Sequence, residues 1–352
     1  MKKQFLLDPD IVFLNHGSFG ACPAPVFDAY QRFQRELERQ PVEFLALERR
    51  LPELLDLARS RLATYVGASP DNIAFAPNAS SALNAVVRSL DLGPGDEVLL
   101  GDEEYGGMQL LWDYVAARSG ATFVRQPFPE LDPGPRTRVV FCSHVEWASG
   151  RVNDVEALCR RARAADALSI VDGAHAPGQI ELDLEAVGAD IYAGNCHKWL
   201  CAPKGSAFLY ARPEAQPLID PLIVSWDWVD GAAFHELHRW QGTRDPSAYL
   251  AVPAAIDFQD LHDWPIVRSR CHELLAALEL PFEPLTDTYV QMRGFRVHHP
   301  DPAGLKRRLY DDHRIEVPVF ETAHGWVLRV SVQGYNDERD LQALEVALTS
   351  LR

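Results

Sequence analysis

The sequence lacks several features that would assign it to common classes of protein. No apolar run is long enough to cross a bilayer, and Asp8 and Asp10 interrupt the apolar residues near the N-terminus. The six cysteines show no Cys-x-x-Cys spacing, which disfavours a zinc site and a disulfide framework. We therefore expect a cytoplasmic protein with reduced thiols, no bound metal and no membrane partner.

Basic residues are also in short supply. The chain carries 34 Lys and Arg residues against 50 Asp and Glu, a formal net charge of −16. Such a charge repels nucleic acid and anionic membrane surfaces, so we expect neither as a partner. No Gly-x-Gly-x-x-Gly turn follows the first strand, which disfavours a nicotinamide-binding domain.

Lysine is particularly scarce, with five in the whole chain. Lys2 and Lys3 lie in the N-terminal tail and Lys306 in a basic helical run, which leaves Lys198 and Lys204 in one loop. A buried lysine can lose its proton and act as a nucleophile, whereas arginine stays protonated. A simple ion pair is the alternative for Lys198, and its polar and aromatic neighbours in a loop bounded by Gly and Pro favour the catalytic interpretation.

Two short apolar runs that we interpret as buried strands precede chemically important residues. ALSIVD ends at Asp172, and ADIYAGN leads into the loop that carries Lys198. Ligands bind at strand ends in an open α/β sheet. An amine and a carboxylate at such ends suit pyridoxal phosphate, which needs the amine for a Schiff base and the carboxylate to keep its ring nitrogen protonated.

Strands alternating with helices over residues 70–210 predict an α/β fold, with a mostly parallel sheet covered by helices on both faces. At 352 residues, we expect more than one domain. The predicted division is an N-terminal arm over residues 1–25 that closes on the active site, a large domain over 26–250, and a small α+β domain over 251–352.

Other segments offer candidate binding residues with more than one interpretation. A strand, the turn Asn78-Ala79-Ser80 and a helix form the arrangement that holds a phosphate, although the same residues serve as ordinary N-caps. Tyr105 follows a later strand, where it can stack on a planar ring or be an ordinary buried tyrosine.

Spaced motifs in the right order resemble a known family. GNCHKWLCAPKGSAFL, with IVDGAHAPGQ upstream and FLNHGSFGACP near the start, is similar to the isopenicillin N epimerase-like branch of the class V aminotransferases. Those proteins are fold-type I pyridoxal phosphate enzymes, a group that also includes cysteine desulfurases and cysteine lyases. The resemblance runs from Asn15 to the C-terminus, and HKW and D-x-A-H are its most specific parts.

The resemblance implies a role for each matched residue. Lys198 would form the internal aldimine, Asp172 would pair with the pyridine nitrogen, His175 would lie beside the ring, and Tyr105 would stack on it. Asn78, Ala79 and Ser80 would hold the phosphate with help from Asn195 and His197, while Arg329 would bind the substrate carboxylate, with Asn15 and His16 nearby. Gly242 and Thr243 would reach the phosphate of a partner subunit, which implies a homodimer with shared active sites.

The implied reaction has several outcomes. An amino acid would form an external aldimine, and the released Lys198 amine would remove the α-proton to give a quinonoid. We expect a C–S lyase or epimerase outcome, with an aminotransferase as an alternative. A persulfide-forming desulfurase is disfavoured because Cys271 lies in a predicted helix, which leaves Cys22 as the loop candidate. A non-catalytic binding protein is disfavoured by the intact Asp172, Lys198 and Arg329.

One segment departs from the family pattern. In HVEWASG, Trp147 stands where the family usually has a small polar residue, and Asn153-Asp154 replace the usual proline. We therefore expect the substrate pocket, rather than the cofactor site, to differ from that of relatives.

Overall fold

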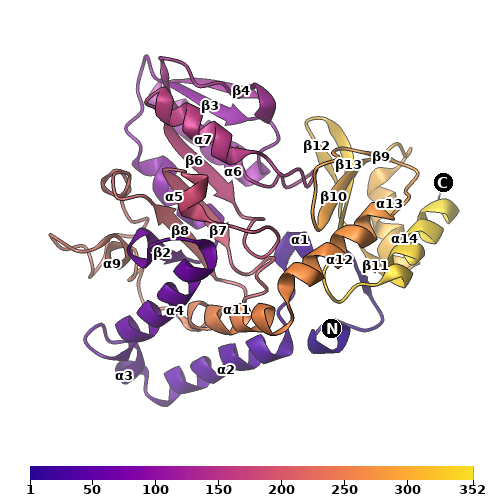
Figure 1. The fold of residues 1–352 in the computed structure, drawn as a ribbon, viewed down its shortest axis with the longest axis horizontal. Coiled ribbons are helices and arrows are strands. Elements are labelled where there is room, and N and C mark those ends of the chain that lie inside the picture. Colours follow the sequence, from indigo (N-terminus) through magenta and orange to yellow (C-terminus); the bar gives the residue numbers. More distant parts are fainter. Residues whose placement is uncertain (352) are drawn as a thin grey trace.

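The computed structural model describes residues 1–351 and has a seven-stranded sheet at its centre (Figure 1). The strand order is β2-β8-β7-β6-β5-β3-β4. The strands are β2 (Ile73–Ala76), β3 (Glu97–Gly101), β4 (Thr122–Gln126), β5 (Thr137–Ser143), β6 (Leu168–Gly173), β7 (Ile191–Asn195) and β8 (Ala207–Ala211). β8 runs antiparallel to both neighbours and the other pairs are parallel, which confirms the expected mostly parallel sheet.

The central strands are apolar along most of their length because helices cover both faces of the sheet. Successive residues of a strand point to opposite faces, so Ile170 and Val171 of β6 belong to different apolar clusters. Ile170 packs in the cluster that contains residues of α5 (Ala79–Ser89) and α6 (Gly106–Ser119), and Val171 in the cluster that contains α7 (Val155–Ala164).

Further helices lie beside this sheet. The segment that follows the N-terminal arm forms three helices, α2 (Ala24–Arg39), α3 (Pro41–Leu45) and α4 (Arg50–Val66). Helix α11 (Val252–Leu261) packs against both α2 and α4. Three four-residue helices lie in the connecting segments: α8 (Leu184–Val187), α9 (Phe234–Leu237) and α10 (Ser247–Leu250). None of the helices in residues 1–351 is both long and apolar enough to span a membrane.

The C-terminal part contains a second, antiparallel sheet of order β12-β13-β10-β9 (Figure 1). Its elements are β9 (Glu283–Pro284), β10 (Met292–Arg296), β12 (Val319–Thr322) and β13 (Gly325–Ser331), with helices α12 (Trp264–Ala276), α13 (Pro302–Asp311) and α14 (Glu338–Ser350). The apolar run IEVPVFE forms two strands rather than one, because β11 (Ile315–Glu316) pairs with β1 (Val12–Phe13) while β12 pairs with β13. Pro318 separates them because it has no N–H for a continuous ladder.

The N-terminal arm packs into the molecule rather than lying on its surface. A short helix, α1 (His16–Phe19), follows β1 in this arm, and His16 is fully buried. Gly20 ends α1 with a φ of +70°, and a Cβ at this position would lie 2.0 Å from the carbonyl oxygen of His197. The arm therefore lies directly against the loop that carries Lys198. The proposed domain boundaries at residues 25 and 250 remain predictions.

Candidate active site

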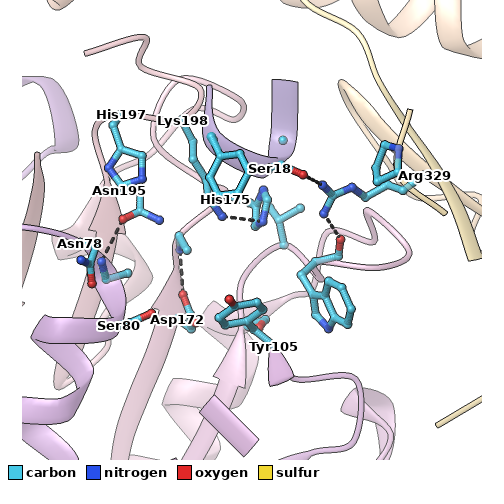
Figure 2. A pocket seen from close by; sticks show the side chains of 18 of the residues that line it. Ser18, Asn78, Ser80, Tyr105, Asp172, His175, Asn195, His197, Lys198 and Arg329 are labelled. Carbon is cyan, nitrogen blue, oxygen red and sulfur yellow. Dashed lines mark hydrogen bonds between the residues drawn. The ribbon is translucent and has the colours of Figure 1, made fainter. Parts of the chain in front are cut away.

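A cavity of about 320 Å³ lies where the strand ends of the large sheet meet α1 and the small sheet (Figure 2). Most of the predicted site residues line it: Asn78, Ala79, Ser80, Tyr105, Asp172, His175, Asn195, His197, Lys198 and Arg329. These residues are far apart in the sequence, and the parallel strands bring many of them to one edge of the sheet.

The predicted carboxylate and amine face the same cavity. Asp172 lies near the end of β6, and its Oδ1 accepts the Ala174 N–H at 2.9 Å. Burial raises the pKa of Asp172, while the Ala174 N–H and Lys198 oppose that shift. Desolvation lowers the pKa of Lys198 to about 7, with Arg329 acting in the same direction. Near neutral pH, much of this amine is therefore unprotonated and nucleophilic.

The second lysine of the loop has a different environment. Lys204 is exposed and lines a separate cavity with residues of the N-terminal arm such as Leu6 and Cys22. It does not line the cavity that contains Asp172 and Lys198. The geometry therefore distinguishes two lysines that are six positions apart in the sequence.

Lys198 also contacts a histidine. Its Nζ lies 3.0 Å from Nε2 of His175 (Figure 2), and the other ring nitrogen of His175 accepts the Trp199 indole N–H at 3.1 Å. Burial and the charge of Lys198 lower the pKa of His175 well below its ordinary value. The imidazole is therefore neutral at physiological pH.

The N-terminus of α5 forms a candidate anion site at one end of the cavity. Asn78 caps the helix by accepting the Ser81 N–H at 2.8 Å, and the Ala79 N–H donates to Asn195 Oδ1 at 2.9 Å (Figure 2). The Ser80 hydroxyl adds a donor beside the positive end of the helix dipole. This turn is thus a helix cap that also lines the cavity, and its role in binding a phosphate stays a prediction.

Arg329 lies at the opposite end of the cavity and is 4% exposed. Its Nη1 donates to the Trp147 carbonyl at 2.6 Å and its Nη2 to Ser18 Oγ at 2.9 Å (Figure 2). Its buried Nε has no hydrogen-bond partner. Within residues 1–351 no carboxylate forms an ion pair with this guanidinium, and burial lowers its pKa to about 10. The cation is thus held by neutral groups and can accept an anionic partner.

Aromatic side chains form the wall beside Arg329. The Trp147 ring stacks on Phe320 with centroids 4.6 Å apart, and its indole N–H donates to the Glu104 carbonyl at 3.1 Å. Tyr105 meets Trp147 edge-on at 5.9 Å and is 47% exposed. The interpretation of Tyr105 as an ordinary buried tyrosine is therefore wrong, because its ring is open to the cavity.

Some predicted site residues do not line this cavity. Asn15 accepts the Ser18 hydroxyl at 2.6 Å, and His16 lies 3.1 Å from the Lys198 carbonyl oxygen, so both stand behind lining residues. Gly242 and Thr243 lie outside the cavity of their own chain, and their expected contact with a partner subunit stays a prediction.

A buried carboxyl group in contact with the cavity-lining Ser143 was not predicted from the sequence. Glu104 is 4% exposed and accepts both the backbone N–H of Ser143, at 2.9 Å, and its hydroxyl, at 2.6 Å. Burial raises its pKa to about 8, and the nearby Asp172 contributes in the same direction. The position of Glu104 after a strand could have indicated a site residue. Glu104 was overlooked because it follows Asp102 and Glu103 in an acidic run.

Comparison with known proteins agrees with this geometry. The model of the family "Aminotransferase class-V" matches residues 12–293. The chain belongs to the class-V aminotransferase family. This finding confirms the resemblance seen in the sequence and the expected class of pyridoxal phosphate-dependent enzyme.

The full-length relatives of this chain include isopenicillin N epimerases, L-cysteine desulfhydrases and a probable cysteine desulfurase. The chain is 39% identical to an isopenicillin N epimerase of Amycolatopsis lactamdurans, over 99% of this chain and 97% of that protein. It is 28% identical to a probable chloroplastic L-cysteine desulfhydrase of Arabidopsis thaliana, over 98% of this chain and 83% of that protein. A solved structure of the cystine C–S lyase C-DES has a TM-score of 0.85 at 24% identity, over 97% of this chain and 98% of that one, which confirms the fold.

Proposed function

We propose that the cavity binds pyridoxal 5′-phosphate and catalyses a reaction at the α-carbon of an amino acid. The groups in the cavity fit this cofactor: an amine with lowered pKa at Lys198, a buried carboxylate at Asp172 and a helix N-terminus at Asn78–Ser80. When bound, the cofactor supplies an electron sink for the bond broken at the α-carbon. Asp172 would hold the proton of the ring nitrogen, and the α5 terminus would bind the phosphate.

The observation that carries the proposal is the buried guanidinium of Arg329 without a carboxylate partner. Burying an unpaired charge is costly, and a bidentate carboxylate is the partner that best offsets the cost. Ser18 and the Trp147 carbonyl fix the orientation of the guanidinium but leave Nε unbonded. The α-carboxylate of an amino acid would bind here, which places its α-carbon between Arg329 and Lys198.

Lys198 would then move the α-proton. A large share of its amine is unprotonated near neutral pH because its pKa is lowered to about 7, so Nζ can take a proton from the α-carbon and hold it. Because the amine acts as a base in the enzyme–substrate complex and must be neutral there, kcat should rise as the pH passes upward through this pKa.

Epimerisation is the first outcome to test, because the full-length relatives at 39% and 37% identity are named isopenicillin N epimerases. C–S bond cleavage is the second, supported by the relatives named L-cysteine desulfhydrases. A persulfide-forming desulfurase has less support. Within residues 1–351 no cysteine lines the cavity, and burial raises the pKa of the partly exposed Cys22 to about 12.

We further propose a homodimer in which Gly242 and Thr243 reach the cavity of the partner. The preceding segment exposes large apolar side chains, with Val224 61%, Trp226 80% and Val229 60% exposed. A second copy of the chain would cover such a patch. The net charge of −16 and the free cysteines support a cytoplasmic protein without nucleic acid or membrane partners.

Proton exchange in heavy water tests the proposal. The holoenzyme should replace the α-proton of suitable L- or D-amino acids with deuterium, measured by proton NMR. Chiral chromatography, sulfide release and 2-oxo acid formation on the same samples then separate epimerisation, C–S cleavage and transamination. Absence of exchange with a broad panel of amino acids and aminoacyl peptides, while the cofactor stays bound, would refute the proposed chemistry.

A further inference from the structure

His175 bridges two residues of the lysine loop through its two ring nitrogens. Its Nε2 lies 3.0 Å from Lys198 Nζ, and its Nδ1 accepts the Trp199 indole N–H at 3.1 Å. Trp199 is fully buried and His175 is 4% exposed, so water does not compete for the bond between them. Trp199 itself does not line the cavity and touches it through His175.

The chemistry of the three groups fixes where the protons lie. An indole nitrogen only donates, so Nδ1 of His175 must be unprotonated, and the neutral ring carries its proton on Nε2. An Nε2–H bonds to Lys198 when the amine offers a lone pair, which an ammonium group lacks. The observed contacts are therefore mutually consistent when Lys198 is a neutral amine.

We propose that Trp199 is a positioning residue: its indole N–H holds His175 as the Nε2–H tautomer, which keeps Lys198 unprotonated for the reaction at the α-carbon. Without that indole N–H, the imidazole can carry its proton on Nδ1 and present the Nε2 lone pair to Lys198. That arrangement stabilises the ammonium form and removes the nucleophile. We call Trp199, His175 and Lys198 the relay. Its role in the reaction rests on the proposed function, whereas the protonation of its three groups is measurable without substrate.

Charged and titratable groups from several elements surround the relay. Lys198 faces Asp172 of β6 and Arg329 of β13, and His175 faces Lys198, Arg329, His197 of the lysine loop and His16 of α1. Burial lowers the pKa of His16 to about 3 and that of His197 to about 4, so neither is charged at neutral pH. Arg329 disfavours the ammonium form and Asp172 favours it, and both remain in place when the Trp199 N–H is removed.

The chain offers a matched control for the loss of an indole N–H. Trp264 of α12 is also buried, and it donates to the Gly178 carbonyl at 2.9 Å. Gly178 lies three residues after His175, so this bond supports the same segment without contacting the imidazole. Trp199→Phe and Trp264→Phe therefore each remove one buried hydrogen bond from one segment, and Trp199→Phe alone frees Nδ1.

The test measures Lys198 directly in full-length protein from which the cofactor has been removed. Acetylation of Lys198 by acetic anhydride, followed by peptide mass spectrometry across a pH series, gives its titration midpoint. The wild type should titrate near a pKa of about 7. Trp199→Phe should raise the midpoint by about one pH unit or more. At pH values well below the midpoint, the neutral fraction of the Lys198 amine is then about tenfold smaller than in the wild type. Trp264→Phe should leave it unchanged.

A midpoint in Trp199→Phe equal to that of the wild type or of Trp264→Phe would overturn the relay. If Trp199→Phe does not fold, nitrogen-15 NMR of the histidine-labelled wild type decides, with the His175 signal assigned by its loss in His175→Gln. The relay requires a protonated Nε2 and a bare Nδ1, and the opposite tautomer or a doubly protonated ring would refute it. Absence of amino-acid turnover would count against the proposed function alone, because neither measurement needs substrate or cofactor.

Discussion

The two ends of the cavity are built in different ways. The amine side consists of Asn78–Ser80, Asp172, His175, Asn195 and Lys198, which lie at or just after strands of the large sheet. The arginine side consists of Ser18, Trp147, Phe320 and Arg329, which come from the N-terminal helix α1, the loop after β5 and the small sheet. One side depends on a single sheet, and the other on segments up to 311 residues apart.

This difference suggests that the amine side determines the chemistry and the arginine side determines the substrate specificity. The sheet fixes the amine side, because consecutive parallel strands bring their ends to one edge and hold Asp172 close to Lys198. The arginine side depends on how the N-terminal arm and the small sheet pack against the rest of the protein, so its shape can vary without disturbing the large sheet. We therefore expect substitutions on the amine side to abolish cofactor binding or turnover, and those on the arginine side to alter substrate use.

The largest effect should follow from loss of the amine. Lys198→Ala removes both the nucleophile and the proton carrier, so turnover should fall by about 10⁴-fold or more and the visible absorbance of the bound cofactor should change. Lys204→Ala, in the same loop but exposed, is the control and should keep both properties. A normal absorbance in Lys198→Ala with its loss in Lys204→Ala would reverse the assignment.

A smaller effect is expected at the opposite end of the cavity. Arg329→Ala should lower kcat/KM by about 10²–10³-fold, because the carboxylate of the substrate loses a buried, oriented charge. Arg329→Lys should recover part of this loss, since an ammonium group keeps the charge but not the fork. Absorbance spectra should show normal cofactor content in both variants. Arg293→Ala, on the neighbouring strand and outside the cavity, should have near-wild-type kinetics.

Trp147 tests whether the arginine side controls substrate choice. Its ring stacks on Phe320, whereas its contact with Arg329 is made by the backbone carbonyl and survives substitution. Trp147→Ala should therefore change the relative kcat/KM of substrates with small and large side chains by up to about tenfold. Trp147→Phe, which keeps an aromatic ring, should change it less. An equal loss for all substrates would indicate damage to Arg329 instead.

The last prediction concerns stability rather than turnover, at Glu104, whose carboxyl group bonds to the cavity-lining Ser143. Its pKa is raised from 4.5 to about 8 in the folded protein, so the fold retains a proton that the unfolded chain loses. Wild-type stability should therefore fall as the pH rises from 4.5 to about 8, by up to about 1.4 kcal/mol per pH unit from this group. Glu104→Gln lacks this titration. Urea unfolding at several pH values should show Glu104→Gln gaining relative to the wild type over that range, and parallel curves would contradict the assignment.

Much of the large sheet was predictable because its strands are continuous apolar runs separated by polar turns. ALSIVD and ADIYAGN coincide with β6 and β7 for this reason. The four-residue helix α1 was missed because so short a helix has no periodic pattern. The break between β11 and β12 was missed because β11 pairs with the N-terminal arm, a contact that local sequence does not encode.

In the candidate site, too, local features could be predicted and contacts between distant segments could not. Lys198 and Asp172 could be predicted because scarce lysine and strand-end position are local signals. The link from Asn15 through Ser18 to Arg329 could not, since it joins the two ends of the chain. The bond between Trp199 and His175 was also missed, because adjacent motifs do not reveal which ring nitrogens face each other.

The central claim is that the Lys198 amine holds the cofactor, and one experiment tests it most directly. Reduction of the holoenzyme with borohydride fixes the cofactor to the amine that binds it, and peptide mass spectrometry then locates the modified residue. The account predicts one modified peptide, with the mass added at Lys198. Modification at Lys204, or no modified lysine in protein loaded with pyridoxal phosphate, would contradict it.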